Sequence, residues 1–257
     1  MGIEGKAAIV TGSATGIGQG IALALAQAGA SVAVTWNREG ADETMRLIEE
    51  AGGRAIPIKT DVRSRESIRG LMEETHRAFG RIDILVNNAA IQPNKLLLEY
   101  GEEDFESVIE TNLKGYWRCI QEALPYLKEL GCGRVINVAS IHAKRPTGFD
   151  PIYAASKGGI KMLTREAALA LGRYGITANT ISPGSVQIVR RKSRPFIQKV
   201  VASRRELAFR NFPPGGFLSG RIGLPADIGY YAVFLADERS QFINGATIRA
   251  DGGAMMI

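Results

Sequence analysis

The sequence is poor in cysteine and has no long hydrophobic run, and each absence excludes a class of protein. Only Cys119 and Cys132 are present among 257 residues, so we expect no disulfide framework and no metal site of the zinc type. No apolar run is long enough to span a bilayer, so we expect no membrane partner. Residues 1–6 lack the pattern of a signal peptide. Together these features predict a cytoplasmic protein.

The positive charge is confined to one segment rather than spread over the chain. The net charge is +6, and residues 190–210 contribute +7 with eight basic side chains and one acid. Because no nucleic-acid-binding motif accompanies this segment, we expect no nucleic-acid partner. The segment either attracts an anionic substrate or forms the solvated face of helices.

Strand-like and helix-like patterns alternate along almost the whole chain. This alternation predicts a single α/β domain over residues 1–257, a Rossmann-type doubly wound parallel sheet with helices on both faces. The expected strands, about seven, are Ala7–Val10, Val32–Trp36, Ala55–Ile58, Ile82–Val86, Arg134–Val138, Ile176–Ile181 and Ala246–Arg249. The expected helices span 17–29, 40–51, 64–79, 102–130, 152–173 and 225–236. Residues 185–222 interrupt the alternation and are expected to form a lid over the substrate.

A glycine-rich turn follows the first predicted strand and leads into the first predicted helix. It reads Thr11-Gly12-Ser13-Ala14-Thr15-Gly16-Ile17-Gly18. Glycines at this spacing permit a tight turn and a close approach of the backbone to a pyrophosphate, which the N-terminus of the helix also favours. The alternative is a turn whose glycines serve only helix packing. The expected cofactor contacts are Gly12, Ser13, Thr15, Gly16, Ile17 and Gly18.

The ends of the next three strands supply further expected cofactor contacts. Asn37 and Arg38 follow the second strand, where an acidic residue would bind the ribose of NAD. Because no acid is present and Arg38 can pair with a 2′-phosphate, we expect NADP slightly ahead of NAD. Asp61–Val62 can contact the adenine, and Asn88–Ala89 lets the cofactor lie close. The alternative for each is ordinary turn or strand-end chemistry.

Tyr153 and Lys157 lie four residues apart in a segment predicted to be helical, so their side chains project from one face. A phenol has a pKa of about 10, and lowering it to ~7 needs roughly 4 kcal/mol. One positive charge ~4 Å away supplies about this much at an effective dielectric of ~20. The pair can therefore transfer protons near neutral pH. The spacing alone also occurs on ordinary surface helices.

Taken in order, these motifs resemble those of the short-chain dehydrogenase/reductase family, in its compact single-domain branch. The resemblance covers essentially the whole chain and also rests on Asn112, Ser140, Pro183-Gly184 and Asp251-Gly252-Gly253. It implies a Rossmann-type fold that binds NAD or NADP and forms a homotetramer or homodimer.

The resemblance also implies a role for each matching residue. Tyr153 would be the general acid/base, and Lys157 would lower its pKa and hold the nicotinamide ribose. Ser140 would bind the substrate oxygen, and Asn112 would hold a water in a proton relay. Pro183–Gly184 would shape the nicotinamide pocket.

Ile188 and His142 lie close in sequence to the motifs Pro183–Gly184 and Ser140. Ile188 is expected at the cofactor where many family members have threonine, so its backbone would serve without a hydroxyl. His142 lies two residues after Ser140 and is expected to be a polar contact or a surface residue rather than a catalytic one. The segment 144–151 is expected to line one wall of the pocket.

The expected function is NAD(P)-dependent interconversion of a secondary alcohol and a ketone, a small-molecule substrate. A sugar, polyol or sugar acid is the favoured class, and a 3-oxoacyl thioester on an acyl carrier protein is the alternative. A non-catalytic NAD(P)-sensing or scaffold protein is the alternative of another kind. The presence of Ser140, Tyr153 and Lys157 together with Asn112 argues against it.

Overall fold

A seven-stranded parallel sheet forms the centre of the computed structural model, which describes residues 2–38, 40–146, 148–188 and 219–256. The order is β3-β2-β1-β4-β5-β6-β7, and every neighbouring pair is parallel. The strands are β1 (Ala7–Val10), β2 (Ser31–Trp36), β3 (Arg54–Lys59), β4 (Ile84–Asn87), β5 (Arg134–Val138), β6 (Thr177–Pro183) and β7 (Thr247–Ala250). The expected doubly wound fold is confirmed. The chain reverses its direction of winding between β1 and β4, where ligands bind in open α/β sheets.

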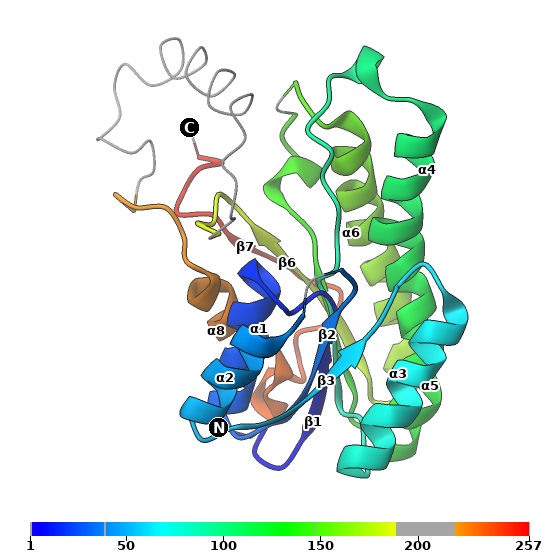
Figure 1. Ribbon diagram of the computed structural model, residues 1–257, viewed down its shortest axis with the longest axis vertical. Coiled ribbons are helices and arrows are strands. Elements are labelled where there is room, and N and C mark those ends of the chain that lie inside the picture. Colours follow the sequence, from blue (N-terminus) through cyan, green and yellow to red (C-terminus); the bar gives the residue numbers. More distant parts are fainter. Residues whose placement is uncertain (1, 39, 147, 189–218, 257) are drawn as a thin grey trace.

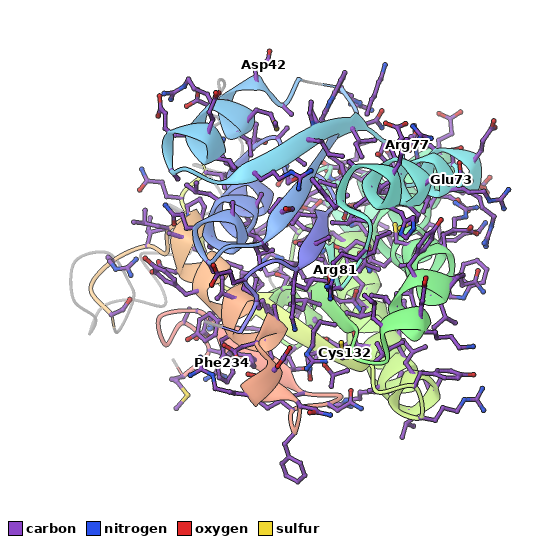
Figure 2. The ribbon with its side chains drawn as sticks, turned by 90° about the horizontal axis from the view of Figure 1, so that it is seen from below. Asp42, Glu73, Arg77, Arg81, Cys132 and Phe234 are labelled. Atoms are coloured by element: carbon purple, nitrogen blue, oxygen red, sulfur yellow. The ribbon has the colours of Figure 1, made fainter. Side chains whose placement is uncertain are left out.

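Helices cover both faces of the sheet (Figure 1). One layer holds α1 (Gly16–Gln27), α2 (Asp42–Glu50) and α8 (Pro225–Ala236). The other holds α3 (Arg65–Phe79), α5 (Gly115–Leu130) and α6 (Pro151–Gly172), with α4 (Glu102–Ile109) leading into α5. The view from below separates the two layers, with Phe234 on α8 and Arg77 on α3 (Figure 2).

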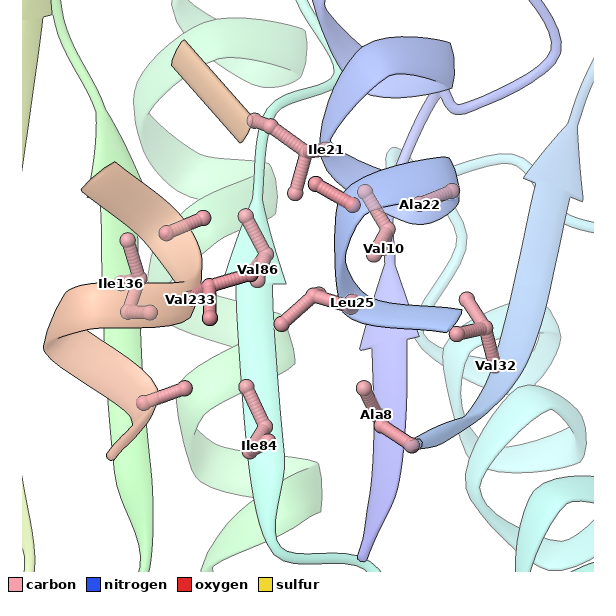
Figure 3. Close-up of a cluster of buried hydrophobic side chains, with 14 of the residues drawn as sticks. Ala8, Val10, Ile21, Ala22, Leu25, Val32, Ile84, Val86, Ile136 and Val233 are labelled. Carbon is pink, nitrogen blue, oxygen red and sulfur yellow. The ribbon is translucent and has the colours of Figure 1, made fainter. Parts of the chain in front are cut away.

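The core consists of two main apolar clusters, one on each face of the sheet, because successive strand residues point to opposite faces. In β1, Ala8 and Val10 pack under α1 and α8, as Figure 3 shows, whereas Ile9 packs on the other side. The α1–α8 contact is especially close. A Cβ added to Gly229 would lie 2.6 Å from the carbonyl oxygen of Gly20, so glycine is required at that crossing.

The helix expected over 102–130 is divided into three parts in the structure. α4 ends at Ile109, residues Glu110–Lys114 form a π-helical turn, and α5 begins at Gly115. An amphipathic pattern does not predict this turn, because a change of hydrogen bonding over so few residues is too short to alter the periodicity of the whole segment. π-Turns are often found at functional sites, and Asn112 lies in this one.

The lid expected over 185–222 is described only at its two ends. Val186 and Gly223 form an isolated parallel bridge, and the N–H of Gln187 donates to the carbonyl of Gly223 at 2.8 Å. The ends of the segment therefore pair with each other beside β6. The basic segment 190–210 lies outside the described residues.

Candidate active site

The glycine-rich turn is held by hydrogen bonds to the ends of β2 and β4. Gly12 and Gly16 have φ values of +63° and +62°, which favour glycine. The Gly12 N–H donates to Thr35 Oγ1 at 2.9 Å, and Asn88 Nδ2 donates to the Gly12 carbonyl at 3.0 Å. A Cβ on Gly18 would lie 2.3 Å from that carbonyl. The start of α1 therefore lies against the turn only because residue 18 is glycine.

The N-terminus of α1 offers backbone donors to an anion. Thr15 is the N-cap, makes no side-chain cap hydrogen bond, and no acidic residue occupies the first turn. Ser13 lies behind the turn instead of facing the opening. Its Oγ donates to the Val10 carbonyl at 2.7 Å and accepts from the Thr35 N–H at 2.9 Å. Ser13 thus fastens the turn to β2, while Thr15 and the glycines border the open space.

A cavity of about 380 Å³ runs along the carboxyl ends of the strands and joins the glycine turn to α6. Most of the expected cofactor contacts line it: Gly12, Thr15, Gly16, Ile17, Gly18, Asn37, Arg38, Asp61, Val62, Asn88, Ala89, Tyr153, Lys157 and Ile188. Other residues that the motifs did not predict also line the cavity: Trp36, Thr60, Arg63, Ala90, Ile91, Ser107, Thr111, Val138 and Ala139. Most of them lie within one or two positions of a predicted residue, so their place follows from the motifs extended by that length.

At one end of the cavity, Asp61 is paired with Arg63, a cation that the sequence motifs do not predict. Arg63 Nη2 lies 2.6 Å from Asp61 Oδ2, and its Nε also donates to the same carboxylate. The hydrogen bond from Arg63, and a weaker one from Asn37, lower the pKa of Asp61. Asp61 is therefore ionised at neutral pH, and Arg38 and Arg63 both border this end of the cavity.

At the other end, Lys157 is almost fully buried beside Tyr153. Its Nζ donates to the Val138 carbonyl at 2.8 Å, contacts Tyr116 Oη at 3.4 Å and lies 5.6 Å from the centre of the Tyr153 ring. Burial lowers the pKa of Lys157 to about 7. The amine is therefore poised between its two charge states near neutral pH, so a neighbouring negative charge would readily protonate it.

Asn112 links the segment after β4 to α6, the helix that carries Tyr153 and Lys157. Its Oδ1 accepts the Ile91 N–H at 2.9 Å, and its Nδ2 donates to the Ile91 carbonyl at 3.0 Å and to Ser156 Oγ at 3.2 Å. Ser156 Oγ in turn donates to the Tyr153 carbonyl at 2.7 Å. The carboxamide of Asn112 is thus engaged with the protein and does not border the cavity.

Ser140 and His142 lie in the short turn after β5, and the His142 ring contacts the Tyr153 ring. Ser140 follows β5, and its Oγ accepts the His142 N–H at 3.2 Å. The His142 ring stands edge-on to the rings of Tyr153 and Phe149, each 5.8 Å away between ring centres. Its Nδ1 is buried without a hydrogen-bond partner, and burial lowers the pKa of His142. The imidazole is therefore neutral at neutral pH.

Pro183 ends β6, Gly184 follows it directly, and Ile188 lies four residues further along the chain. Pro183 is the last, buried residue of that strand, and the Gly184 N–H donates to the Ala250 carbonyl at 2.9 Å. Ile188 reaches back over the glycine turn, with its Cγ2 3.1 Å from where a Cβ on Gly16 would lie. Of the three, only Ile188 borders the cavity.

The residues that the structure describes contain neither a metal-binding cluster nor a membrane-spanning helix. No three or more His, Cys, Asp or Glu side chains are grouped so as to hold a metal ion. Within the same residues, every helix is too short or too polar to cross a bilayer.

The fold, the glycine turn and the long cavity at the strand ends define a dinucleotide-binding protein of the Rossmann type. A family model described as Enoyl-(Acyl carrier protein) reductase matches residues 12–255. The 3-oxoacyl-(acyl-carrier-protein) reductase of Thermotoga maritima is 34% identical over 257 residues, covering 100% of both chains.

Solved structures give the same assignment. A "putative short-chain alcohol dehydrogenase" from Sinorhizobium meliloti superposes with a TM-score of 0.88 at 34% identity, covering 98% of this chain and 97% of that one. A "putative 2-deoxy-d-gluconate 3-dehydrogenase" from Agrobacterium tumefaciens, with bound NADP, has a TM-score of 0.85 at 32% identity, covering 99% and 98%.

The chain belongs to the short-chain dehydrogenase/reductase family. It is an NAD(P)-dependent oxidoreductase that acts on CH–OH groups. The residues of the cavity fit this cofactor class, since the glycine turn lines it at the N-terminus of α1, where no side chain caps the helix and no acid occupies the first turn.

Proposed function

We propose that this chain interconverts a secondary alcohol and a ketone with Tyr153 as the general acid/base. The observation that carries the proposal is that Tyr153 and Lys157 border the same cavity as the glycine turn. A dinucleotide whose diphosphate lies at the turn then has its nicotinamide end near the phenol. When bound, the nicotinamide accepts or supplies the hydride.

The side chains of this chain handle the proton. In the oxidative direction Tyr153 Oη takes the proton of the substrate hydroxyl, and in reduction it returns that proton to the oxygen. Lys157 stabilises the phenolate by its charge, and the Ser140 hydroxyl donates to the substrate oxygen. Asn112 holds Ile91 and, through Ser156, the first turns of α6, and so fixes the direction of the phenol.

NADP is the preferred cofactor in this proposal. Arg38 and Arg63 border one end of the cavity, and the two guanidinium groups suit a 2′-phosphate. Asp61 is engaged by Arg63. The Agrobacterium tumefaciens protein with bound NADP supports this choice. The cofactor contacts expected through Ser13, Pro183 and Gly184 stay predictions, and none of the three residues borders the cavity.

A sugar, polyol or sugar acid remains the leading substrate class. The buried Nδ1 of His142 has no partner and lies beside the Tyr153 ring, where a second substrate hydroxyl would give it one. The name of the Agrobacterium tumefaciens neighbour, a 2-deoxy-d-gluconate dehydrogenase, points to the same class.

A 3-oxoacyl thioester is the second candidate, and a separate observation favours it. Leu96, Leu97 and Leu98 are exposed on the segment that follows the cavity wall, and Leu98 is 96% exposed. An apolar ridge of this kind suits an acyl chain. The Thermotoga maritima relative carries the corresponding name.

The test is absorbance at 340 nm with NADP⁺, NADPH, NAD⁺ and NADH against sugars, polyols, sugar acids and 3-oxoacyl thioesters. Tyrosine-dependent turnover on one class, lost in Tyr153→Phe with cofactor affinity unchanged, supports the proposal and selects the substrate. Turnover that survives in Tyr153→Phe refutes the assigned role. Cofactor binding without turnover on any compound favours the sensing or scaffold alternative.

Assembly and location extend the same proposal. The resemblance implies a homotetramer or homodimer, and the low cysteine content favours the cytoplasm. Several apolar side chains on α8 and after it are exposed in the single chain, including Tyr230, Phe234 and Phe242. Sedimentation equilibrium at micromolar concentration measures the assembly directly.

A further inference from the structure

Asp150 is a buried carboxylate that the proposed proton transfer does not use. It is the N-cap of α6, three residues before Tyr153, and its side chain is fully buried. Three donors from the segment after β4 hold it: Gln92 Nε2 at 2.8 Å, the Lys95 N–H at 3.1 Å and Tyr100 Oη at 3.0 Å. Its own N–H donates to the Lys95 carbonyl at 2.8 Å.

The catalytic turn is therefore held to this segment at two points, one on each side of Tyr153. Three residues before the tyrosine, Asp150 binds residues 92–100. Three residues after it, Ser156 meets Asn112, which grips both backbone groups of Ile91. Ile91 borders the cofactor cavity, so the Asn112 contact joins the cavity wall to the helix that carries the phenol. Asp150 joins the same helix to the residues that follow Ile91.

Burying the carboxylate of Asp150 costs free energy, because the group loses its hydration and needs hydrogen-bond donors to replace the water. Asp150 also has a φ of +55°, in the left-handed region that is uncommon for residues other than glycine. The start of α6 compensates in part, because negative charge is favourable at a helix N-terminus. The remaining compensation comes from the donors of residues 92–100.

We propose that Asp150 is a positioning residue that sets the place of Tyr153 relative to segment 91–100, which begins at the cavity wall with Ile91. The inference rests on the proposed role of Tyr153 as acid/base. Loss of the carboxylate releases residues 92–100 from the first turn of α6 while the glycine turn stays intact. Turnover should then fall and cofactor binding should not.

The central variant is Asp150→Asn, which keeps the shape of the side chain but presents an NH₂ group to donors. Asp83→Asn is the matched control. Asp83 is equally buried and also binds three donors, from Ala7 and Arg81, but it lies at the amino ends of the strands, away from α6. Both variants lose a buried, fully bound carboxylate, so general destabilisation affects both.

For Asp150→Asn we expect kcat to fall about 10- to 100-fold, with the Kd for NADP(H) changed less than about 2-fold. We expect this fall because a small misplacement of a reacting group lowers the rate by about this factor. Asp83→Asn should lower the melting temperature and leave kcat within about 2-fold of wild type. Hydrogen exchange of the cofactor-free protein adds a readout without substrate: backbone N–H groups in 91–100 and 152–156 should exchange faster in Asp150→Asn only.

Two results would overturn the proposal. One is a wild-type kcat in Asp150→Asn while Tyr153→Phe is inactive; the other is an equal loss of kcat in Asp83→Asn. Turnover that survives in Tyr153→Phe overturns the proposed function instead, so the two failures are distinguishable.

If Asp150→Asn does not fold, Tyr100→Phe carries the test, because it removes one donor and keeps the carboxylate. It should lower kcat several-fold at unchanged cofactor Kd, and an unchanged kcat would count against Asp150.

Discussion

Lys157 should make the cofactor-free protein less stable at neutral pH than at alkaline pH. Burial lowers its pKa from 10.5 to about 7 in the folded protein. Between these values the unfolded chain binds a proton that the folded chain does not, so stability rises with pH. From pH 7.5 to 9.5 the difference amounts to about 2.5 kcal/mol, at ~1.36 kcal/mol for each unit of pKa.

Replacing the amine should remove this dependence. Lys157→Met keeps a flexible chain of similar length in the same buried space, but it leaves the Val138 carbonyl without its donor, at a cost of about 1–2 kcal/mol. At pH 7.5 we expect the inactive variant to be more stable than wild type by about 2 kcal/mol. At pH 9.5 the advantage should have disappeared, because the cost of keeping the amine neutral has then fallen to about 1.4 kcal/mol and the lost hydrogen bond to Val138 offsets it.

Urea unfolding at pH 7.5, 8.5 and 9.5, at one protein concentration and without cofactor, measures the effect. Lys161→Met, on the same helix but only partly buried, is the control and should follow wild type at each pH. Parallel stability curves for wild type and Lys157→Met would refute the reasoning. They would mean that Lys157 stays charged in the folded protein across this range.

Three further predictions follow from close contacts and burial. Gly18→Ala should weaken NADP(H) binding at least 10-fold, measured by fluorescence titration, because the new Cβ would lie 2.3 Å from a turn carbonyl; unchanged affinity would contradict the assigned turn. Gly229→Ala should cost about 2 kcal/mol or more in unfolding free energy, because its Cβ would meet the Gly20 carbonyl at 2.6 Å; a wild-type melting temperature would show that α8 can shift away from α1. Burial raises the pKa of Cys119 to about 12, so a disulfide reagent at pH 8 should modify the partly exposed Cys132 first and Cys119 only on unfolding; two equally fast thiols would contradict this.

The sequence by itself determined the sheet and the position of the cofactor turn. Alternating apolar strands and amphipathic helices allow few arrangements, since parallel strands need crossover helices and those crossovers are right-handed. Gly12, Gly16 and Gly18 could be assigned because their requirement is local: a left-handed backbone or a missing Cβ. Tyr153 and Lys157 could be paired because helical spacing fixes their common face.

Only the tertiary structure decided which polar groups meet across long stretches of sequence. Asp150 and Tyr100 are 50 residues apart, and Asn112 and Ser156 are 44 apart. Nothing in the spacing of either pair indicates a contact. The burial of Lys157, which sets its pKa, likewise depends on Tyr116 and Val138 from other elements. Local preference fixes the backbone of each segment, but contacts between distant segments and the dielectric around a charge exist only once the chain is packed.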